Sequence, residues 1–136
     1  MKNLPLLKKD LIKIGLCAGF MVLPFAAHAD VAAEVSTAAK HAGMSAASDA
    51  LPMAHAHLHH VVNCLVGPDG KGYDQKAENP CTGQGNGAIP DTSDAAQKKM
   101  LERAVARASA GLKSDDLATV KKDATRVQTA LEAFKP

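Results

Sequence analysis

The sequence predicts an all-α protein, an antiparallel four-helix bundle made of two repeated helical hairpins with a glycine-rich loop between them. Two observations lead to this fold. At an offset of 66 residues the chain aligns with itself without a gap, so that segments starting at Val35 and Leu101 share an apolar skeleton and a turn. Within both segments apolar residues recur every three or four positions, which is typical of helices with one buried face. Two such hairpins can bury their apolar faces against each other as a bundle.

The first residues of the chain, 1–29, have the pattern of a secretory signal peptide. Lysines precede a short apolar run, and small residues at positions 27 and 29 form a cleavage site before Asp30. The run is shorter than the ~20 apolar residues that cross a bilayer, so we expect no membrane span after cleavage. The pattern therefore predicts an exported protein, periplasmic or secreted.

Removal of this segment takes away four lysines and one aspartate, which leaves 107 residues with 12 basic and 13 acidic side chains. The formal net charge is then −1, and a chain of this length predicts one domain, residues 30–136. There is no basic patch, and Tyr73 and Phe134 are the only aromatic residues that remain, so we expect no nucleic-acid partner. The sequence indicates no particular protein partner.

The first hairpin is expected over residues 31–65, with helices at 31–47 and 50–65. Ser48 or Asp49 is a suitable N-cap for the second of these helices. Pro52 falls in its first turn, where a missing N–H costs little. Its apolar stripe consists of Leu51, Ala54, Leu58, Val61 and Leu65.

The second hairpin is expected over residues 94–134, with helices at 94–110 and 115–134. Ser114 or Asp115 is the candidate N-cap of the last helix. Short turns within each hairpin make the neighbouring helices antiparallel. The stripe of the last helix consists of Leu117, Val120, Ala124, Val127, Leu131 and Phe134.

The connection between the hairpins, residues 66–93, is rich in glycine, proline, asparagine and aspartate, and we expect it to be irregular. Cys64 and Cys81 remain after cleavage, and an exported chain meets an oxidising compartment, so a disulfide between them is expected. By the chain-entropy model, closing a loop of this length contributes ~3 kcal/mol. The rival interpretation makes Cys64 a thiolate ligand beside the histidines. The loop does not match a calcium-binding EF-hand.

Histidines are concentrated in the first hairpin, where "HAHLHH" places four of them within six residues. The positions 66 residues later carry no histidine, so the repeated fold does not require histidine there. This contrast predicts a local purpose, and metal binding is the interpretation that fits best. The candidate ligands are His41, His55, His57, His59 and His60.

Helical spacing groups these residues by face. His55 and His59 are four residues apart and can converge on one ion, which makes them the primary pair. His57 and His60 form a second, weaker pair, and His60 is expected to point outward. His41 lies at a similar height on the preceding helix, so it could complete a site with His55 and His59 or pair with His57 on the other side.

The type of ligand predicts the type of ion. Imidazole suits copper, zinc and nickel, and copper binds nitrogen ligands most tightly among the common divalent ions, so copper is favoured. Met44 and Met53 lie nearer the turn and are possible soft ligands for Cu(I). Because neutral imidazole is the ligand, binding should weaken below about pH 6.

The export signal, the repeated hairpin, "AAKHAGMSAASDAL" and "HAHLHH" together make the chain resemble small periplasmic metal-binding proteins, which are four-helix bundles built from alanine- and histidine-rich repeats. The resemblance implies binding of copper or another divalent metal for buffering or metal tolerance. The chain departs from this pattern because its second hairpin lacks histidine and a cysteine-containing loop separates the hairpins. One or two metal sites are therefore expected rather than many.

Two other functions remain open at this stage. The protein could be an interaction or stress protein of the cell envelope that binds no metal, or a bundle that holds a b-type haem between two histidines. An enzyme is not expected, because no Ser/His/Asp set and no acid–base pair with a substrate pocket can be placed.

Overall fold

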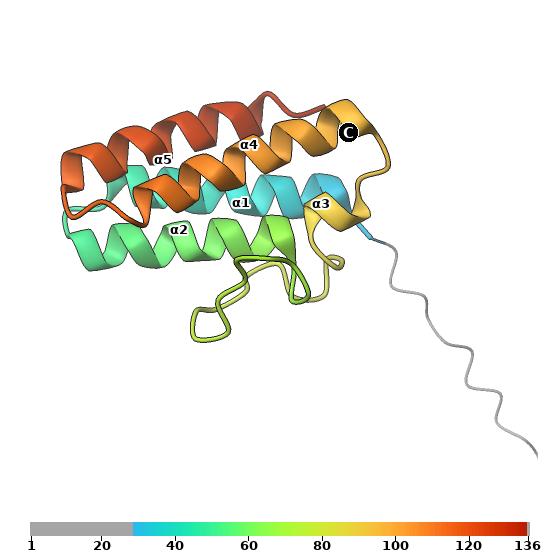
Figure 1. Cartoon of the computed structure of the whole chain (residues 1–136), viewed down its shortest axis with the longest axis horizontal. Helices are drawn as coiled ribbons and strands as arrows, with labels where there is room; N and C mark the ends of the chain where they lie inside the picture. Colours follow the sequence, from blue (N-terminus) through green and yellow to red (C-terminus); the bar gives the residue numbers. More distant parts are fainter. Residues whose placement is uncertain (1–28, 136) are drawn as a thin grey trace, which may run out of the picture.

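The computed structural model describes residues 29–135, which form five helices and no strand (Figure 1). The prediction of an all-α protein is confirmed for this part of the chain. The expected signal peptide, residues 1–29, lies outside the described residues except for its last position. The helices are α1 (Val31–Ala47), α2 (Leu51–Val66), α3 (Ala88–Asp91), α4 (Ala95–Gly111) and α5 (Leu117–Glu132).

The four long helices lie side by side along the length of the molecule (Figure 1). α1 packs against α2 and α5, and α4 packs against α5 and α2. The short helix α3 contacts α1, α2 and α4 near one end of the molecule. Within residues 29–135, no helix is both long enough and apolar enough to cross a membrane.

The buried faces of the long helices repeat at the same offset as the sequence. The first and last residues of α5 lie 66 positions after those of α2. Each buried residue of α5 likewise lies 66 positions after a buried residue of α2. The buried positions of α1 and α4 also correspond at this offset, although α4 begins and ends two residues early. The pairs are Ala54–Val120, Leu58–Ala124, Val61–Val127 and Leu65–Leu131 in α2 and α5, and Val35–Leu101, Ala38–Ala104, Ala42–Ala108 and Ser45–Gly111 in α1 and α4.

Small residues on these faces allow the helices to approach closely. A Cβ atom at Gly111 would lie only 2.8 Å from Cδ1 of Leu58, so a larger residue in α4 would collide with α2. Where α1 and α2 meet, the buried Ser45 hydroxyl donates a hydrogen bond to the Ala54 carbonyl over 2.8 Å. The core is thus made mainly of alanine, valine and a few leucines, and a single added methyl group is felt.

Aspartates start three of the four long helices. In each, the side chain precedes the first turn and accepts a hydrogen bond from a backbone N–H that has no partner within the helix. The bonds run from Ala33 N to Asp30 (2.9 Å), from Gln97 N to Asp94 (2.7 Å) and from Thr119 N to Asp116 (2.8 Å).

The N-caps expected within the two hairpins are wrong. α2 follows Ala50, whose side chain cannot cap, rather than Ser48 or Asp49. α5 follows the aspartate after the two expected candidates, Ser114 and Asp115. Before α2 and before α5 several adjacent polar residues offer caps, and the side chain that fits depends on where the preceding helix ends.

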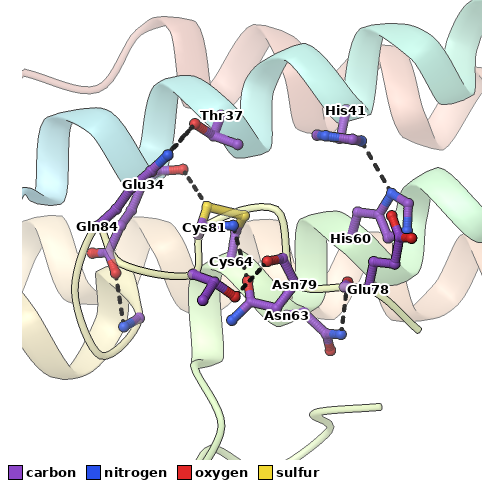
Figure 2. The surroundings of a disulfide bond; sticks show 12 residues. Glu34, Thr37, His41, His60, Asn63, Cys64, Glu78, Asn79, Cys81 and Gln84 are labelled. Carbon is purple, nitrogen blue, oxygen red and sulfur yellow. Dashed lines mark hydrogen bonds between the residues drawn. A yellow bond between two sulfur atoms is a disulfide. The ribbon is translucent and has the colours of Figure 1, made fainter. Parts of the chain in front are cut away.

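The connection between α2 and α4 is pinned by a disulfide. Cys64 and Cys81 are both buried, with an S–S distance of 2.01 Å and Cα atoms 5.2 Å apart (Figure 2). The expected pairing is confirmed, and a thiolate ligand at Cys64 is ruled out because its sulfur is bonded to Cys81. The expectation that residues 66–93 are wholly irregular is wrong at α3, which lies within them.

A buried asparagine fixes the first part of the same connection. The Asn63 side chain is fully buried and meets the loop backbone in several places. Its amide donates to the carbonyls of Asp74 and Glu78 over 3.0 and 3.2 Å, and its oxygen accepts from the Asp74 N–H over 2.9 Å. Asn63 therefore holds residues 74–78 against the outer side of α2.

Candidate metal centre

Three histidines from two helices meet where α1 and α2 pack. His41 belongs to α1, whereas His57 and His60 lie one turn apart on α2. The Nδ1 atom of His41 is 3.2 Å from Nδ1 of His57 and 3.2 Å from Nδ1 of His60. Each residue offers a ring nitrogen, and these three atoms all lie within 4.8 Å of one another. All three side chains are half-buried.

The local sequence explains why these rings reach the interface. Each of the three histidines directly precedes a fully buried residue of its helix, so each lies at the edge of a buried face rather than in its centre. At that edge a ring can contact the neighbouring helix and still keep one side open to solvent. The three buried residues are Ala42, Leu58 and Val61.

Hydrogen bonding alone does not account for the two contacts of the His41 Nδ1 atom. A neutral imidazole nitrogen carries either one N–H or one lone pair, so it makes one good in-plane hydrogen bond. The Nδ1 atom of His41 has two partners at the same distance of 3.2 Å. Both contacts cannot be full hydrogen bonds in any single choice of tautomers. A cation that accepts all three lone pairs removes this conflict.

The spacing also suits coordination. Two metal–nitrogen bonds of ~2.0 Å that meet at a tetrahedral angle place their nitrogens ~3.3 Å apart. The two measured Nδ1 separations of 3.2 Å are close to that value. The three rings are also turned relative to one another, with interplanar angles of 46°, 86° and 78°, rather than stacked in parallel. Three nitrogen donors could thus occupy one side of a tetrahedral ion and leave a position open.

Two of the three histidines are held in the form that binds metal. Burial lowers the pKa of His41, the neighbouring His60 and His57 lower it further, and the Glu78 carboxylate opposes them. Burial also lowers the pKa of His60, with a further contribution from His57, and Glu78 again opposes. Both rings are therefore neutral at pH 7, and their nitrogens are available to a cation.

The structure does not bring His55 and His59 together with His41, as the primary grouping required; it has His41 beside His57, the other placement left open for His41. His55 Nε2 lies 3.0 Å from the carbonyl of Ser114, in the connection between α4 and α5. His59 Nδ1 lies 3.2 Å from the Asp74 carboxylate, in the loop after α2. Each of these rings has its own partner on a different part of the chain.

The expectation that His60 points outward is also wrong, because its ring contacts His41. Successive residues of a helix turn by ~100°, which places His57 and His60 on one flank of α2 and His55 and His59 on the other. α1 packs against the His57 flank. Which flank receives α1 depends on the side from which α1 packs against α2, and the spacing of residues in one helix does not contain that information.

The two methionines considered as soft ligands lie beside this cluster rather than in it. Met44 is three residues after His41 in α1, and Met53 is four residues before His57 in α2. They are the large hydrophobic side chains that stand most exposed in residues 29–135, at 49% and 55% of full exposure. Because neither packs in the core, an apolar packing role does not account for them.

Comparisons of the chain with protein-family models, with curated proteins and with solved structures found no match. The candidate metal centre is therefore supported by its own geometry and chemistry.

Proposed function

We propose that the protein binds one divalent transition-metal ion through His41, His57 and His60, as a metal-buffering or metal-tolerance protein of the cell envelope. The convergence of the three imidazoles carries this proposal, since the Nδ1 atoms of His57 and His60 both lie 3.2 Å from that of His41. Imidazole is the commonest protein ligand for such ions, and three nitrogens on a rigid pair of helices need little rearrangement to bind one. The role is binding rather than catalysis.

Copper is the ion that we favour. Nitrogen ligands follow the order in which Cu²⁺ binds more tightly than Ni²⁺ or Zn²⁺. The exposed methionines Met44 and Met53 lie three and four residues from His41 and His57, and their thioether sulfurs would suit copper in its reduced state, Cu(I), beside the three-histidine site. Zinc and nickel remain the alternatives, because the same imidazoles accept either ion.

An envelope location is proposed from the amino-terminal pattern and from the cysteines. Residues 1–29 carry the features of an export signal, and disulfides persist in oxidising compartments such as the periplasm. The buried Cys64–Cys81 pair is consistent with such a compartment.

We further infer that the scaffold is a four-helix bundle of two related hairpins, as in the small periplasmic metal-binding proteins that the sequence resembles. The matching buried positions at an offset of 66 residues support an internal repeat. A b-type haem is less well supported. Its two axial ligands must lie on opposite faces of a flat macrocycle, whereas these ring nitrogens crowd together on one side.

The test uses untagged protein purified from the periplasm without metal-affinity resin or chelator. We expect near-stoichiometric metal, or one equivalent taken up on titration of the metal-free protein with Cu²⁺. A variant with alanine at His41, His57 and His60 should lose this binding, and a matched variant with alanine at His55 and His59 should keep it. A wild-type protein that takes up no copper, zinc or nickel would reject the proposal and favour an envelope interaction protein instead.

A further inference from the structure

The loop after α2 brings carboxylates onto the helix that supplies two of the three histidines. Asn63, one turn after His60, holds the backbone at residues 74–78, and the neighbouring Cys64 is bonded to Cys81. Two acidic side chains of this loop face histidines of α2. One, Asp74, already contacts His59, which lies outside the three-histidine cluster.

The other acidic side chain, Glu78, lies beside the cluster. In the view of Figure 2 its carboxylate is drawn over the ring of His60, although no ion pair joins the two side chains. Its negative charge raises the pKa of His41 and of His60. The larger effect on each ring is burial, which lowers the pKa. The Glu78 carbonyl is fixed by Asn63 over 3.2 Å, so its backbone stays in place.

The Glu78 side chain is free to move from this fixed backbone. It is exposed, and no hydrogen bond or ion pair holds its carboxylate among residues 29–135. In this structure the Glu78 carboxylate is not part of the group of close donor atoms that the three histidines form. A change of side-chain rotamer, which costs little for an exposed glutamate, moves the carboxylate without moving the loop.

We propose that Glu78 closes the metal centre as its fourth ligand, giving three imidazole nitrogens and one carboxylate oxygen. This inference rests on the proposed metal binding by the histidines. Tetrahedral sites combine His nitrogen and Glu oxygen ligands at similar bond lengths of ~2.0–2.2 Å. The carboxylate also cancels one of the two charges of the ion, which a set of neutral imidazoles leaves uncompensated in a half-buried site.

A fourth ligand of this kind selects the ion and gives the long loop a purpose. Carboxylate oxygen is a hard ligand, so the complete site prefers Cu²⁺ or Zn²⁺ to Cu(I). Asn63 and the Cys64–Cys81 disulfide then act as positioning residues, because they fix the backbone that carries Glu78. The role of the loop is then to place the fourth ligand, Glu78, beside the histidines.

The test compares Glu78→Gln with wild type, using Zn²⁺ for affinity and Co²⁺ for the visible spectrum of the bound ion. We expect Zn²⁺ to bind at least ~10-fold more weakly to the variant, the lower range for losing even an outer partner of a metal ligand. The Co²⁺ bands should also shift, because one oxygen donor is replaced. Glu102→Gln, which removes the same charge from an exposed position on α4, should match wild type in both measurements.

The outcomes separate this inference from the proposed function. If wild-type protein binds Zn²⁺ and Glu78→Gln matches it in affinity and in Co²⁺ spectrum, Glu78 is no ligand, although the histidine site stands. If wild-type protein binds neither ion, the proposed metal binding itself fails. A weaker affinity in Glu78→Gln with an unchanged Co²⁺ spectrum also overturns direct ligation, because it reduces Glu78 to a distant charge.

Discussion

The Nδ1 atoms of His41 and His57 lie 3.2 Å apart, and 66 positions later the side chains of Arg107 and Asp123 form an ion pair of 3.0 Å. Corresponding positions therefore hold two like side chains between α1 and α2, and two oppositely charged side chains between α4 and α5. An arginine and an aspartate satisfy each other without help. The His41 Nδ1 atom has a second partner, His60, and cannot make a full hydrogen bond to both histidines, so this group could hold a cation.

The third position of the cluster follows the same rule. Arg126 corresponds to His60 at this offset, and its guanidinium lies 3.9 Å from the Asp123 carboxylate. An Arg–Asp–Arg group therefore occupies in α4 and α5 the place that three histidines occupy in α1 and α2. Both groups place polar side chains in contact with each other at the edge of a close contact between two helices.

This correspondence predicts that a second metal site can be grafted. Replacing Arg107, Asp123 and Arg126 by histidine should raise the metal capacity from one ion to two, measured by calorimetric titration with Cu²⁺. The new site should be the weaker one, because the loop that carries Glu78 is held on α2 by Asn63, at the first site. The single variant Arg107→His serves as the control and should bind one ion. A triple variant that folds, as judged by circular dichroism, yet still binds one ion would contradict the structural equivalence.

The lowered pKa values of His41 and His60 predict how metal-free protein responds to acid. Both groups have an ordinary pKa of 6.5, which applies to the unfolded chain, and a lower one in the folded protein. As the pH falls below 6.5, the unfolded chain takes up protons that the folded protein does not. The free energy of unfolding therefore decreases as the pH falls. Well above pH 6.5 both histidines are neutral in the folded and the unfolded state, and stability no longer depends on their protonation.

The measurement is the free energy of unfolding by urea between pH 5 and 8 in the presence of a chelator. The difference between wild type and a variant with glutamine at His41 and His60 should change across pH 6.5, because glutamine does not titrate. Metal affinity should change in the same direction and fall as the pH is lowered, because protons compete with the ion for the imidazole nitrogens. A difference between the two proteins that does not depend on pH would contradict this account.

Much of the fold could be predicted from residue spacing, because spacing reports on one helix at a time. The bounds of α1 and the apolar stripes of α2 and α5 follow from which residues must be buried. The Cys64–Cys81 pair was expected because these two cysteines are the ones that follow the expected signal peptide, and because an exported chain would meet an oxidising compartment. None of these expectations required knowledge of how the helices are placed relative to one another.

The candidate site could be predicted only as a set of histidines, because its membership is a property of the packing. His55 and His59 have good spacing, but α1 packs on the other flank of α2 and supplies His41 to His57 and His60. Glu78 carries no sequence signal, since its position depends on the path of a long loop. That path is set by the buried side chain of Asn63 and by a covalent bond, and neither effect has a periodic pattern.

A buried carboxyl predicts a pH response of opposite sign. Glu34 is fully buried, its Oε1 accepts from the Gly87 N–H over 2.8 Å, and its Oε2 has no partner among the described residues. Burial raises its pKa from 4.5 to about 7, and the neighbouring Asp91 and Asp30 add to this effect, while the Gly87 hydrogen bond opposes it. The folded protein therefore keeps a proton that the unfolded chain releases above pH 4.5.

The contribution of Glu34 to stability is complete below pH 4.5 and is lost as the pH rises through about 7. Glu34→Gln imitates the protonated acid, so it should be more stable than wild type at pH 8 and should lack this loss. Urea unfolding of both proteins at pH 5, 6.5 and 8 measures the difference. Asp49→Asn, at an exposed turn, is the control and should follow wild type. Equal slopes for Glu34→Gln and wild type would mean that the buried carboxyl titrates normally.

The last prediction concerns the disulfide, which we expect to act on stability and on metal binding. Replacing Cys64 and Cys81 by alanine opens a loop with a sequence separation of 17 residues. The free energy of unfolding should fall by ~3 kcal/mol in the chain-entropy model, measured by urea unfolding of the metal-free protein. Zn²⁺ affinity should fall as well, because the backbone that carries Glu78 is no longer held at Cys81.

Combining this change with Glu78→Gln distinguishes the two effects. If the disulfide supports metal binding by placing Glu78, the glutamine substitution should weaken Zn²⁺ binding far less in the cysteine-free protein than in wild type. Circular dichroism on each variant shows whether the helices persist. Full additivity of the two losses in folded protein would mean that the disulfide stabilises the fold without positioning the ligand.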